Sequence, residues 1–281
     1  SADGGTTFTK VLGTGLGIAG AVSNFCYDVD IAANGDVYAS LNGSIHKSTN
    51  AGVTWGAAQT VPITLGRVEL ACAPSDANYV YALVENGTVV NGILRTTNGG
   101  TTWTSRTEPV DADPGCPASD FSNGQAWYDM SIAVDPNHRD SVFVGGLDIF
   151  KSADGAATWT QIGHWYGGFG FPYVHADQHN IVFKPGSSSI AYFTNDGGVF
   201  RTANADVAAP AMVDKGLNYV TSQFYACALH PTAFSSYCLG GTQDNGSHQF
   251  TQPVLQNTVE ATGGDGAFCH IDQDQPQFQF T

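Results

Sequence analysis

An octapeptide of one form recurs four times along the chain, and it constrains the fold more than any other feature. It starts with Ser or Thr, has Asp or Asn at its third position, Gly or Ala at the next two, and ends in Thr and an aromatic residue. The copies begin at residues 1, 48, 96 and 152, so they are 47, 48 and 56 residues apart. This period is the length of a four-stranded β-propeller blade rather than of a solenoid turn. The copies are Ser1–Phe8, Ser48–Trp55, Thr96–Trp103 and Ser152–Trp159.

Each position of the octapeptide has a local task. The Asp or Asn side chain accepts backbone N–H groups across the turn, and Gly supplies the positive φ. The Thr returns the chain to a strand, and the aromatic side chain packs under the turn. We interpret the octapeptide as a staple of the fold and do not expect its carboxylate to be catalytic. At Thr202 the motif has diverged, so we expect that blade to keep its strands and lose its staple.

Pairs of short alternating apolar runs, joined by turns, recur with the same period. Six such pairs predict six hairpins and an all-β fold, a β-propeller of four-stranded blades with about six blades represented. We expect one propeller domain over residues 1–281 and, since the repeat is cut at both ends, a longer parent chain. The hairpins are Val29–Ala39, Leu70–Ala82, Ile132–Val144, Ile181–Phe193, Cys227–Leu239 and Cys269–Phe280. The blade segments are about 1–12, 25–62, 66–108, 126–164, 179–213, 223–257 and 266–281.

The charge balance limits the partners that we expect. There are 25 acidic and 10 basic residues, for a net charge of −15, which argues against nucleic acid because its binding needs a basic patch. No apolar run approaches the ~18 residues of a membrane span. An acidic surface with few lysines is typical of a secreted or cell-surface protein. It favours calcium or a cationic partner, with simple solubility as the alternative.

The six cysteines lack the C-x-x-C spacing of a zinc site. In an extracellular chain their even number permits up to three disulfides. Cys227 and Cys238 flank one hairpin and form the best candidate pair, because they could lie opposite one another across two strands. Buried free thiols remain the alternative.

Propeller geometry predicts where a ligand would bind. The octapeptides mark one face, and the loops before each blade's first strand and between its second and third strands meet on the other. Acidic, amide and imidazole groups concentrate in those loops, which is what a ligand site for a glycan or peptide requires. The predicted ligand-binding residues are His175, Asp177, His179, Gln243, Asp244 and Asn245.

Two segments suggest bound cations. His175, Asp177 and His179 have period two, so an extended segment would project all three to one side and could hold a divalent transition metal. Alternatively they hydrogen-bond neighbouring blades at the mouth of the channel. The segment Asp111–Gly115 resembles the opening of a calcium loop but lacks the later carboxylates, so a solvated loop is its other interpretation. The aromatic run Trp165–Tyr173 suits sugar stacking or packing between blades.

The octapeptides and hairpins resemble the Asp-box, or BNR-repeat, propellers. That superfamily includes sialidases, xyloglucanases, sortilin-type receptors and photosystem assembly factors, and it specifies a fold more than an activity. Further segments look most like large secreted bacterial proteins described as "glycosyl hydrolase, BNR repeat". Sialidase activity needs an arginine triad. Arg95 and Arg201 occupy a repeated slot at the end of the third strand, so they look structural and leave too few arginines.

The xyloglucanase resemblance implies two catalytic carboxylates. Thr194–Arg201 is similar to the segment that carries one acid, with one residue displaced, and Gly264–Phe268 is similar to the segment of the other. Carried over, these acids are Asp196 and Asp265. A separation of about 6.5–9.5 Å would allow an inverting mechanism. In the resembled family the two acids face each other from separate propellers, whereas here they are 69 positions apart in neighbouring blades.

Three functions are therefore open. The first is a secreted or cell-surface propeller that binds a glycan or peptide on the face opposite the octapeptides. The second is an inverting glycoside hydrolase that acts on a β-glucan such as xyloglucan. The third is an interaction scaffold within a larger extracellular assembly, together with further domains of a longer chain.

Overall fold

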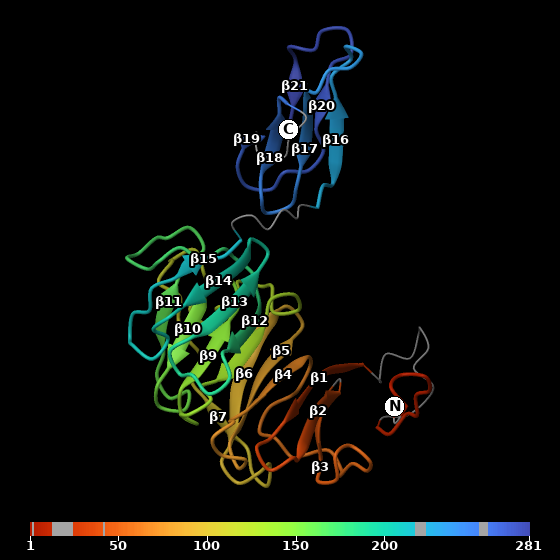
Figure 1. The fold of residues 1–281 in the computed structure, drawn as a ribbon. Coiled ribbons are helices and arrows are strands. Elements are labelled where there is room, and N and C mark those ends of the chain that lie inside the picture. Colours follow the sequence, from red (N-terminus) through yellow and green to blue (C-terminus); the bar gives the residue numbers. More distant parts are fainter. Residues whose placement is uncertain (2, 13–24, 42, 217–222, 253–257) are drawn as a thin grey trace. The chain divides into compact units, whose positions relative to one another are not determined.

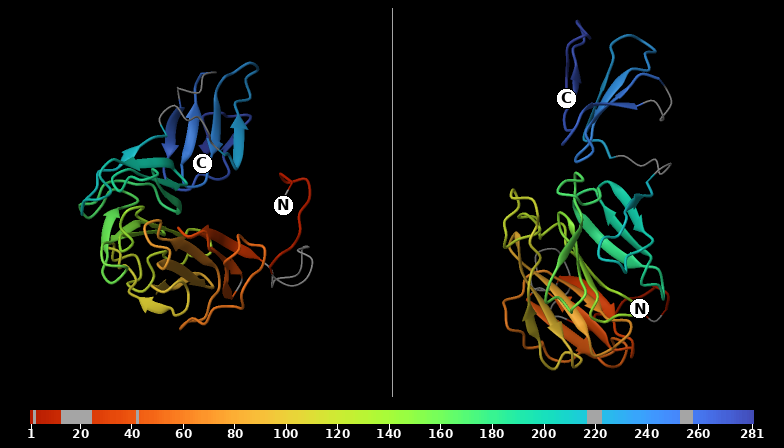
Figure 2. Two further views of the ribbon diagram at one scale, coloured as in Figure 1. Left: turned by 60° about the horizontal axis from the view of Figure 1, so that its bottom comes forward. Right: turned by 90° about the vertical axis from the view of Figure 1, so that its left-hand side faces the viewer.

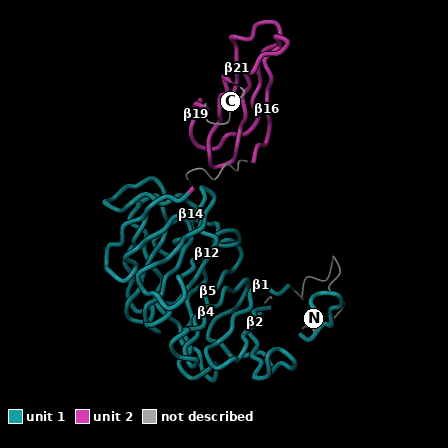
Figure 3. Tube along the Cα trace, viewed as in Figure 1, with its two compact units in different colours: residues 1–215 teal, residues 216–281 magenta. Residues whose placement is uncertain are grey.

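The computed structural model describes residues 1, 3–12, 25–41, 43–216, 223–252 and 258–281. These residues form 21 strands in six antiparallel sheets and contain no helix, which confirms the predicted all-β propeller class. Accordingly, no apolar helix of membrane-spanning length occurs among them. The chain divides into two compact units, residues 1–215 and 216–281 (Figure 3), and each is described by itself below.

Unit 1 holds four sheets in which each strand pairs with the one before it in the sequence (Figure 1). This meander is the strand order of a propeller blade. The first sheet consists of β1 (Cys26–Ile31), β2 (Val37–Leu41) and β3 (Ser44–Ser48). The second consists of β4 (Val68–Cys72), β5 (Val80–Asn86), β6 (Val89–Thr96) and β7 (Thr104–Arg106). The third consists of β8 (Ser131–Val134), β9 (Val142–Gly145), β10 (Ile149–Ser152) and β11 (Thr160–Gly163). The fourth consists of β12 (Gln178–Phe183), β13 (Ala191–Asn195), β14 (Gly198–Thr202) and β15 (Val213–Asp214).

The sheets of unit 1 follow one another around an arc (Figure 2), with their first strands β1, β4, β8 and β12 adjacent in that order. The core lies between successive sheets. Strand β5 shows why, because alternate side chains of a strand point to opposite faces. Val80 and Val84 pack with the first sheet, whereas Tyr81 and Leu83 pack with the third. A third cluster joins the third and fourth sheets around Phe193. The blades are therefore held together by apolar burial on both faces of the central strands.

The predicted hairpins are present in all six sheets, with Val29 opposite Ala39 in the first and His270 opposite Phe280 in the last. The octapeptides from residues 48, 96 and 152 follow third strands and form one type of turn. In the copy at Ser48, Asn50 Oδ1 accepts the Thr54 N–H at 2.9 Å, and Ser48 Oγ accepts the Gly52 N–H at 2.9 Å. The interpretation of this motif as a hydrogen-bonded staple is confirmed.

The expectation that the staple is lost at Thr202 is wrong in part. Thr202 Oγ1 still lies 2.8 Å from Asn204 Oδ1 and accepts the Asn204 N–H at 3.2 Å. What changes is the second half of the turn, because Asn204 Oδ1 accepts the N–H of Ala211, seven residues later. The turn keeps its polar pair while the loop lengthens.

Unit 2 holds one sheet of four strands and one of two. Part of the predicted blade segment 223–257 lies outside the described residues, which omit 253–257. The small core contains Ala228, Leu239 and Ile271. The strands are β16 (Ala226–Leu229), β17 (Cys238–Gly241), β18 (Ser247–Phe250), β19 (Thr258–Thr262), β20 (His270–Ile271) and β21 (Gln279–Phe280).

The pairing of β16 with β17 corrects the predicted disulfide geometry. Cys227 lies opposite Gly240, and Cys238 lies opposite Leu229, so the two cysteines are offset rather than facing. All six cysteines are free thiols in the structure. The register is set by which side chains reach the core, and Leu239 takes the buried position between the two sheets.

Candidate functional site

The first strands of the four blades of unit 1 line a groove of about 740 Å³. Its wall is acidic where β1 meets β4. Asp28 accepts the Leu70 N–H at 2.7 Å, and Asp30 accepts the Cys72 N–H at 2.6 Å. These carboxylates satisfy backbone donors that the edge of a sheet would otherwise leave unpaired.

The predicted polar loops of unit 1 that precede β12 and follow β9 and β13 meet at one end of this groove. The Gln178 N–H donates to Gly146 at 2.9 Å, which ties the start of β12 to the turn between β9 and β10. Gln178 also pairs with Asn195, beside the turn between β13 and β14. The octapeptide turns come after β3, β6 and β10, and therefore lie at the opposite end of these sheets.

Asp196 is the centre of a polar cluster at this end. Its carboxylate accepts the Tyr128 hydroxyl, with oxygen distances of 3.0 and 3.1 Å, and Oδ1 lies 2.6 Å from His179 Nε2. The rings of Tyr128 and His179 meet edge to face, with centroids 4.9 Å apart. We call the set of Trp127, Tyr128, Asp129, Asp177, His179 and Asp196 the Asp196 site.

A buried acid pair lies behind Asp196. Asp177 offers a carboxylate oxygen within 4.8 Å of one from Asp196, and its Oδ1 accepts the Gln125 amide at 3.3 Å. Burial raises the pKa of Asp177, and the nearby Asp196 charge adds to this. Burial and then the neighbouring Asp177 raise the pKa of Asp129 to about 9. One proton is therefore retained by this pair near neutral pH.

Two aromatic side chains form the exposed part of the site. Trp127 is 60 % exposed and Tyr128 is 39 % exposed, with ring centroids 5.5 Å apart. Arg67 holds their backbone, because its Nη1 donates to the carbonyls of Trp127 at 2.7 Å and Tyr128 at 3.2 Å. Arg67 is itself paired with Glu69 at 2.9 Å. The aromatic pair is thus fixed by an ion-paired guanidinium rather than left on a free loop.

The predicted alternation of His175, Asp177 and His179 is wrong. Strand β12 starts only at Gln178, and Asp177 has a positive φ of 65°, which breaks the extended geometry. The three side chains have different surroundings as a result. The His175 ring packs on Gly197, where a Cβ atom would lie 2.3 Å from it, whereas His179 Nε2 lies 2.6 Å from Asp196 Oδ1. Within the described residues these three do not form a compact ligand set.

The remaining predicted residues lie in unit 2. The Asp244 N–H donates to Asp265 at 3.1 Å, and the Asn245 side chain donates to the carbonyl of Gln243 at 3.2 Å. Gln243 also accepts the hydroxyl of Tyr225. The predicted pair Asp196 and Asp265 is thus divided between the two units.

Sequence reasoning missed Trp127, Tyr128 and Gln125 as members or supports of the site. They end the long stretch that links β7 to β8. The available signal was the adjacent aromatic pair directly before a first strand, at the end of the blade where the polar loops were expected.

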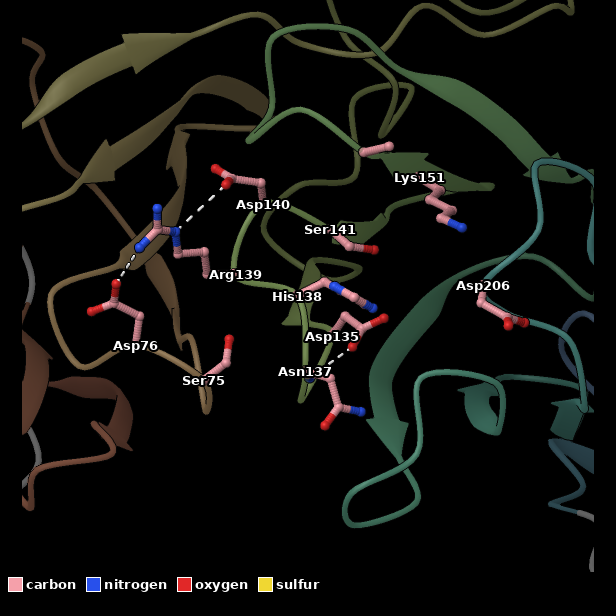
Figure 4. Close-up of a pocket in the computed structure, with 11 residues that line it drawn as sticks. Ser75, Asp76, Asp135, Asn137, His138, Arg139, Asp140, Ser141, Lys151 and Asp206 are labelled. Carbon is pink, nitrogen blue, oxygen red and sulfur yellow. Dashed lines mark hydrogen bonds and ion pairs between the residues drawn. The ribbon is translucent and has the colours of Figure 1, made fainter.

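A second hollow, of about 550 Å³, lies among the turns between first and second strands (Figure 4). Its cations already have partners. Arg139 is ion-paired with Asp76 and with Asp140, and Lys151 donates to the carbonyls of Ala205 at 2.7 Å and Val207 at 3.0 Å. These bonds link neighbouring blades, so this hollow is explained by blade packing.

Comparison with known proteins agrees with the architecture. A xyloglucanase of Paenibacillus sp is 29 % identical over 187 residues, which cover 59 % of this chain and 17 % of that protein. The GH74 xyloglucanase structure from Xanthomonas campestris matches with a TM-score of 0.51 and 17 % identity, over 92 % of this chain and 42 % of that one. YCF48 from Cyanidioschyzon merolae matches with a TM-score of 0.45 and 11 % identity, over 89 % of this chain and 77 % of that one.

The chain thus spans less than half the length of either xyloglucanase. The solved structures indicate the fold alone at these identities. One family model, described as the DUF6242 beta propeller domain, matches residues 1–227, which is most of the sequence. The chain therefore belongs to the DUF6242 β-propeller domain family.

Proposed function

We propose that unit 1 binds a β-glucan-type glycan at the Asp196 site. The observation that carries the proposal is the contact of Asp196 with Tyr128 and His179, directly beside the exposed ring of Trp127. Sugar rings present apolar C–H faces that pack on aromatic side chains and hydroxyl groups that donate to carboxylates. The site offers both kinds of group, and Arg67 holds the backbone of the aromatic pair.

The comparisons support the class of ligand. The Paenibacillus relative is a xyloglucanase, and this suggests a β-glucan such as xyloglucan. We also propose that the protein acts outside the cell, where such polymers occur, and its acidic, lysine-poor composition is consistent with this. A peptide ligand and an interaction role within a larger assembly are the competing proposals.

Hydrolysis is the second candidate. The resemblance that nominates Asp196 and Asp265 would make the protein an inverting glycoside hydrolase, with one acid protonating the leaving oxygen and the other activating water. A retained proton on the pair of Asp129 and Asp177 favours a site that handles protons, although Asp129 itself is buried.

Titration calorimetry with xyloglucan and cello-oligosaccharides tests the binding proposal. Trp127→Ala and Asp196→Asn should each weaken binding at least about tenfold, or ~1.4 kcal/mol. Phe234→Ala is the matched control, because Phe234 is a fully exposed aromatic residue in unit 2. Equal affinity of wild type and both variants, or no β-glucan binding by the wild type, would remove the proposal. If the wild type binds a peptide and the same variants lose that binding, the ligand of the site is a peptide rather than a glycan.

Product analysis after digestion of xyloglucan tests hydrolysis separately. Asp196→Asn and Asp265→Asn should each abolish product release if these acids are the pair. Activity retained by either variant would exclude that residue as a catalytic acid, whatever the binding result.

A further inference from the structure

A second acidic cluster in unit 1 shares no residue with the Asp196 site. Asp111 belongs to the segment after β7, Asp148 to the turn between β9 and β10, and His164 directly follows β11. Each offers a ligand atom within 4.8 Å of the other two. All three are buried, with exposed fractions of 8 %, 1 % and 0 %. We call these residues the buried acidic site.

One oxygen of this cluster has no partner. Asp111 Oδ1 accepts the Asp113 N–H at 2.8 Å and the Gln161 amide at 3.4 Å, whereas its Oδ2 is buried without a hydrogen bond. Both oxygens of Asp148 accept hydrogen bonds. Oδ1 accepts the Trp165 N–H at 2.6 Å, and Oδ2 accepts the Gln161 amide at 2.9 Å. A buried carboxylate oxygen without a donor is costly unless a proton or a cation occupies the space.

In the part of the chain that the structure describes, neither a lysine nor an arginine neutralises the pair. Among the ion pairs of the described ranges, none joins Asp111 or Asp148 to a lysine or arginine. Two anions side by side in a buried setting favour the uptake of a positive ion.

His164 indicates which ions fit. Its Nδ1 lies 3.5 and 3.4 Å from the backbone nitrogens of Tyr166 and Gly168, which donate to it. The proton of the neutral ring is then on Nε2, which lies 3.5 Å from Asp148 Oδ2 and 3.9 Å from Asp113 Oδ2. In this tautomer Nε2 carries a proton and does not ligate a metal, and it is buried without a hydrogen-bond partner. The available ligands are therefore oxygens, which suit calcium and similar hard cations.

We propose that Asp111 and Asp148 bind a divalent, oxygen-preferring cation, with calcium as the first ion to test. The ion would join the segment after β7 to the third blade. Because Asp148 also accepts the Trp165 N–H, the ion would order the aromatic run Trp165–Tyr173. This proposal does not depend on the glycan-binding proposal.

Elemental analysis and melting curves of the full chain test this site. Protein stripped with chelator should gain several degrees in melting temperature on addition of calcium at about a hundredfold excess over Kd, because an ion bound only to the folded state stabilises it. Elemental analysis should find one bound ion per chain. Asp111→Asn and Asp148→Asn should each abolish the shift. Each should also melt higher than stripped wild type, because one buried negative charge is gone.

Asp129→Asn is the matched control, since it removes another buried acid outside this cluster and should keep the calcium shift. His164→Gln should also keep most of it. A shift produced by zinc alone and lost in His164→Gln would overturn the oxygen ligand set. An unchanged melting temperature with every ion tested, together with no metal by elemental analysis, would show that the acids share a proton instead.

Discussion

Aspartates at the two ends of the same blades have opposite electrostatic states. At the octapeptide end, burial is the largest single influence on Asp154 and opposes its ionisation, but hydrogen bonds from Thr158, Ser152 and Ala157 together outweigh it and lower the pKa of Asp154 to about 2. At the other end, burial and a neighbouring carboxylate raise the pKa of Asp129 to about 9. A carboxylate surrounded by donors stabilises the fold, whereas one that faces another acid costs stability and is available for protons, cations or ligands.

We expect the largest change in the free energy of unfolding when a carboxylate that accepts several hydrogen bonds is removed. Asp154→Ala deletes acceptors for Ser152, Ala157 and Thr158, and we expect a loss of about 2 kcal/mol after allowance for solvent exposure. The folded-state pKa lies below the unfolded one, so this contribution is present above about pH 4 and disappears as pH falls through about 2. Denaturant unfolding of variant and wild type at pH 7 and pH 3 measures it. An equal loss at both pH values would contradict the electrostatic part of the explanation.

At the polar-loop end of the blades, we expect removal of an aspartate charge to raise the stability of the fold rather than lower it. Asp129 is buried and faces Asp177 and, more weakly, Asp120. Its folded-state pKa is raised, so the wild type is most stable below the unfolded pKa near 4 and loses stability as pH rises toward about 9. Asp129→Asn removes this penalty and keeps a donor toward Asp177. It should therefore stabilise the protein by at least about 1 kcal/mol at pH 8, with little change at pH 4.

Melting curves across this pH range check the effect of Asp129→Asn. A variant that is less stable than wild type at pH 8 would mean that Asp129 is ionised and satisfied, and the contrast between the two ends of the blades would fail.

We expect the smallest loss of stability from a substitution in the diverged turn that follows Thr202. Asn204→Ala removes one backbone acceptor contact, with Ala211, and the pair with Thr202. We expect a loss below about 1 kcal/mol, smaller than that of Asp154→Ala in the same denaturant assay. An equal or larger loss would show that the lengthened loop depends on this residue as much as a complete octapeptide does on its acid.

Local signals account for much of what could be predicted. The octapeptides and hairpins are short, so their hydrogen bonds join residues only a few positions apart, and sequence spacing reveals them directly. The Asp196 site is different. Its members Tyr128 and Asp196 are 68 positions apart, and the positive φ at Asp177 was invisible in an alternating pattern. The same holds for the offset of Cys227 and Cys238, which depends on register.

By itself, the sequence determined the all-β class, the blade period, the six hairpins and the end of the blades at which polar loops gather, because these follow from local turn chemistry and alternation. Only the tertiary structure decided which loops meet. It placed Asp111, from a segment interpreted either as the opening of a calcium loop or as a solvated loop, beside Asp148 and His164, and it placed the Tyr128 hydroxyl against Asp196. Packing of whole sheets against each other sets these distances, and no local pattern encodes them.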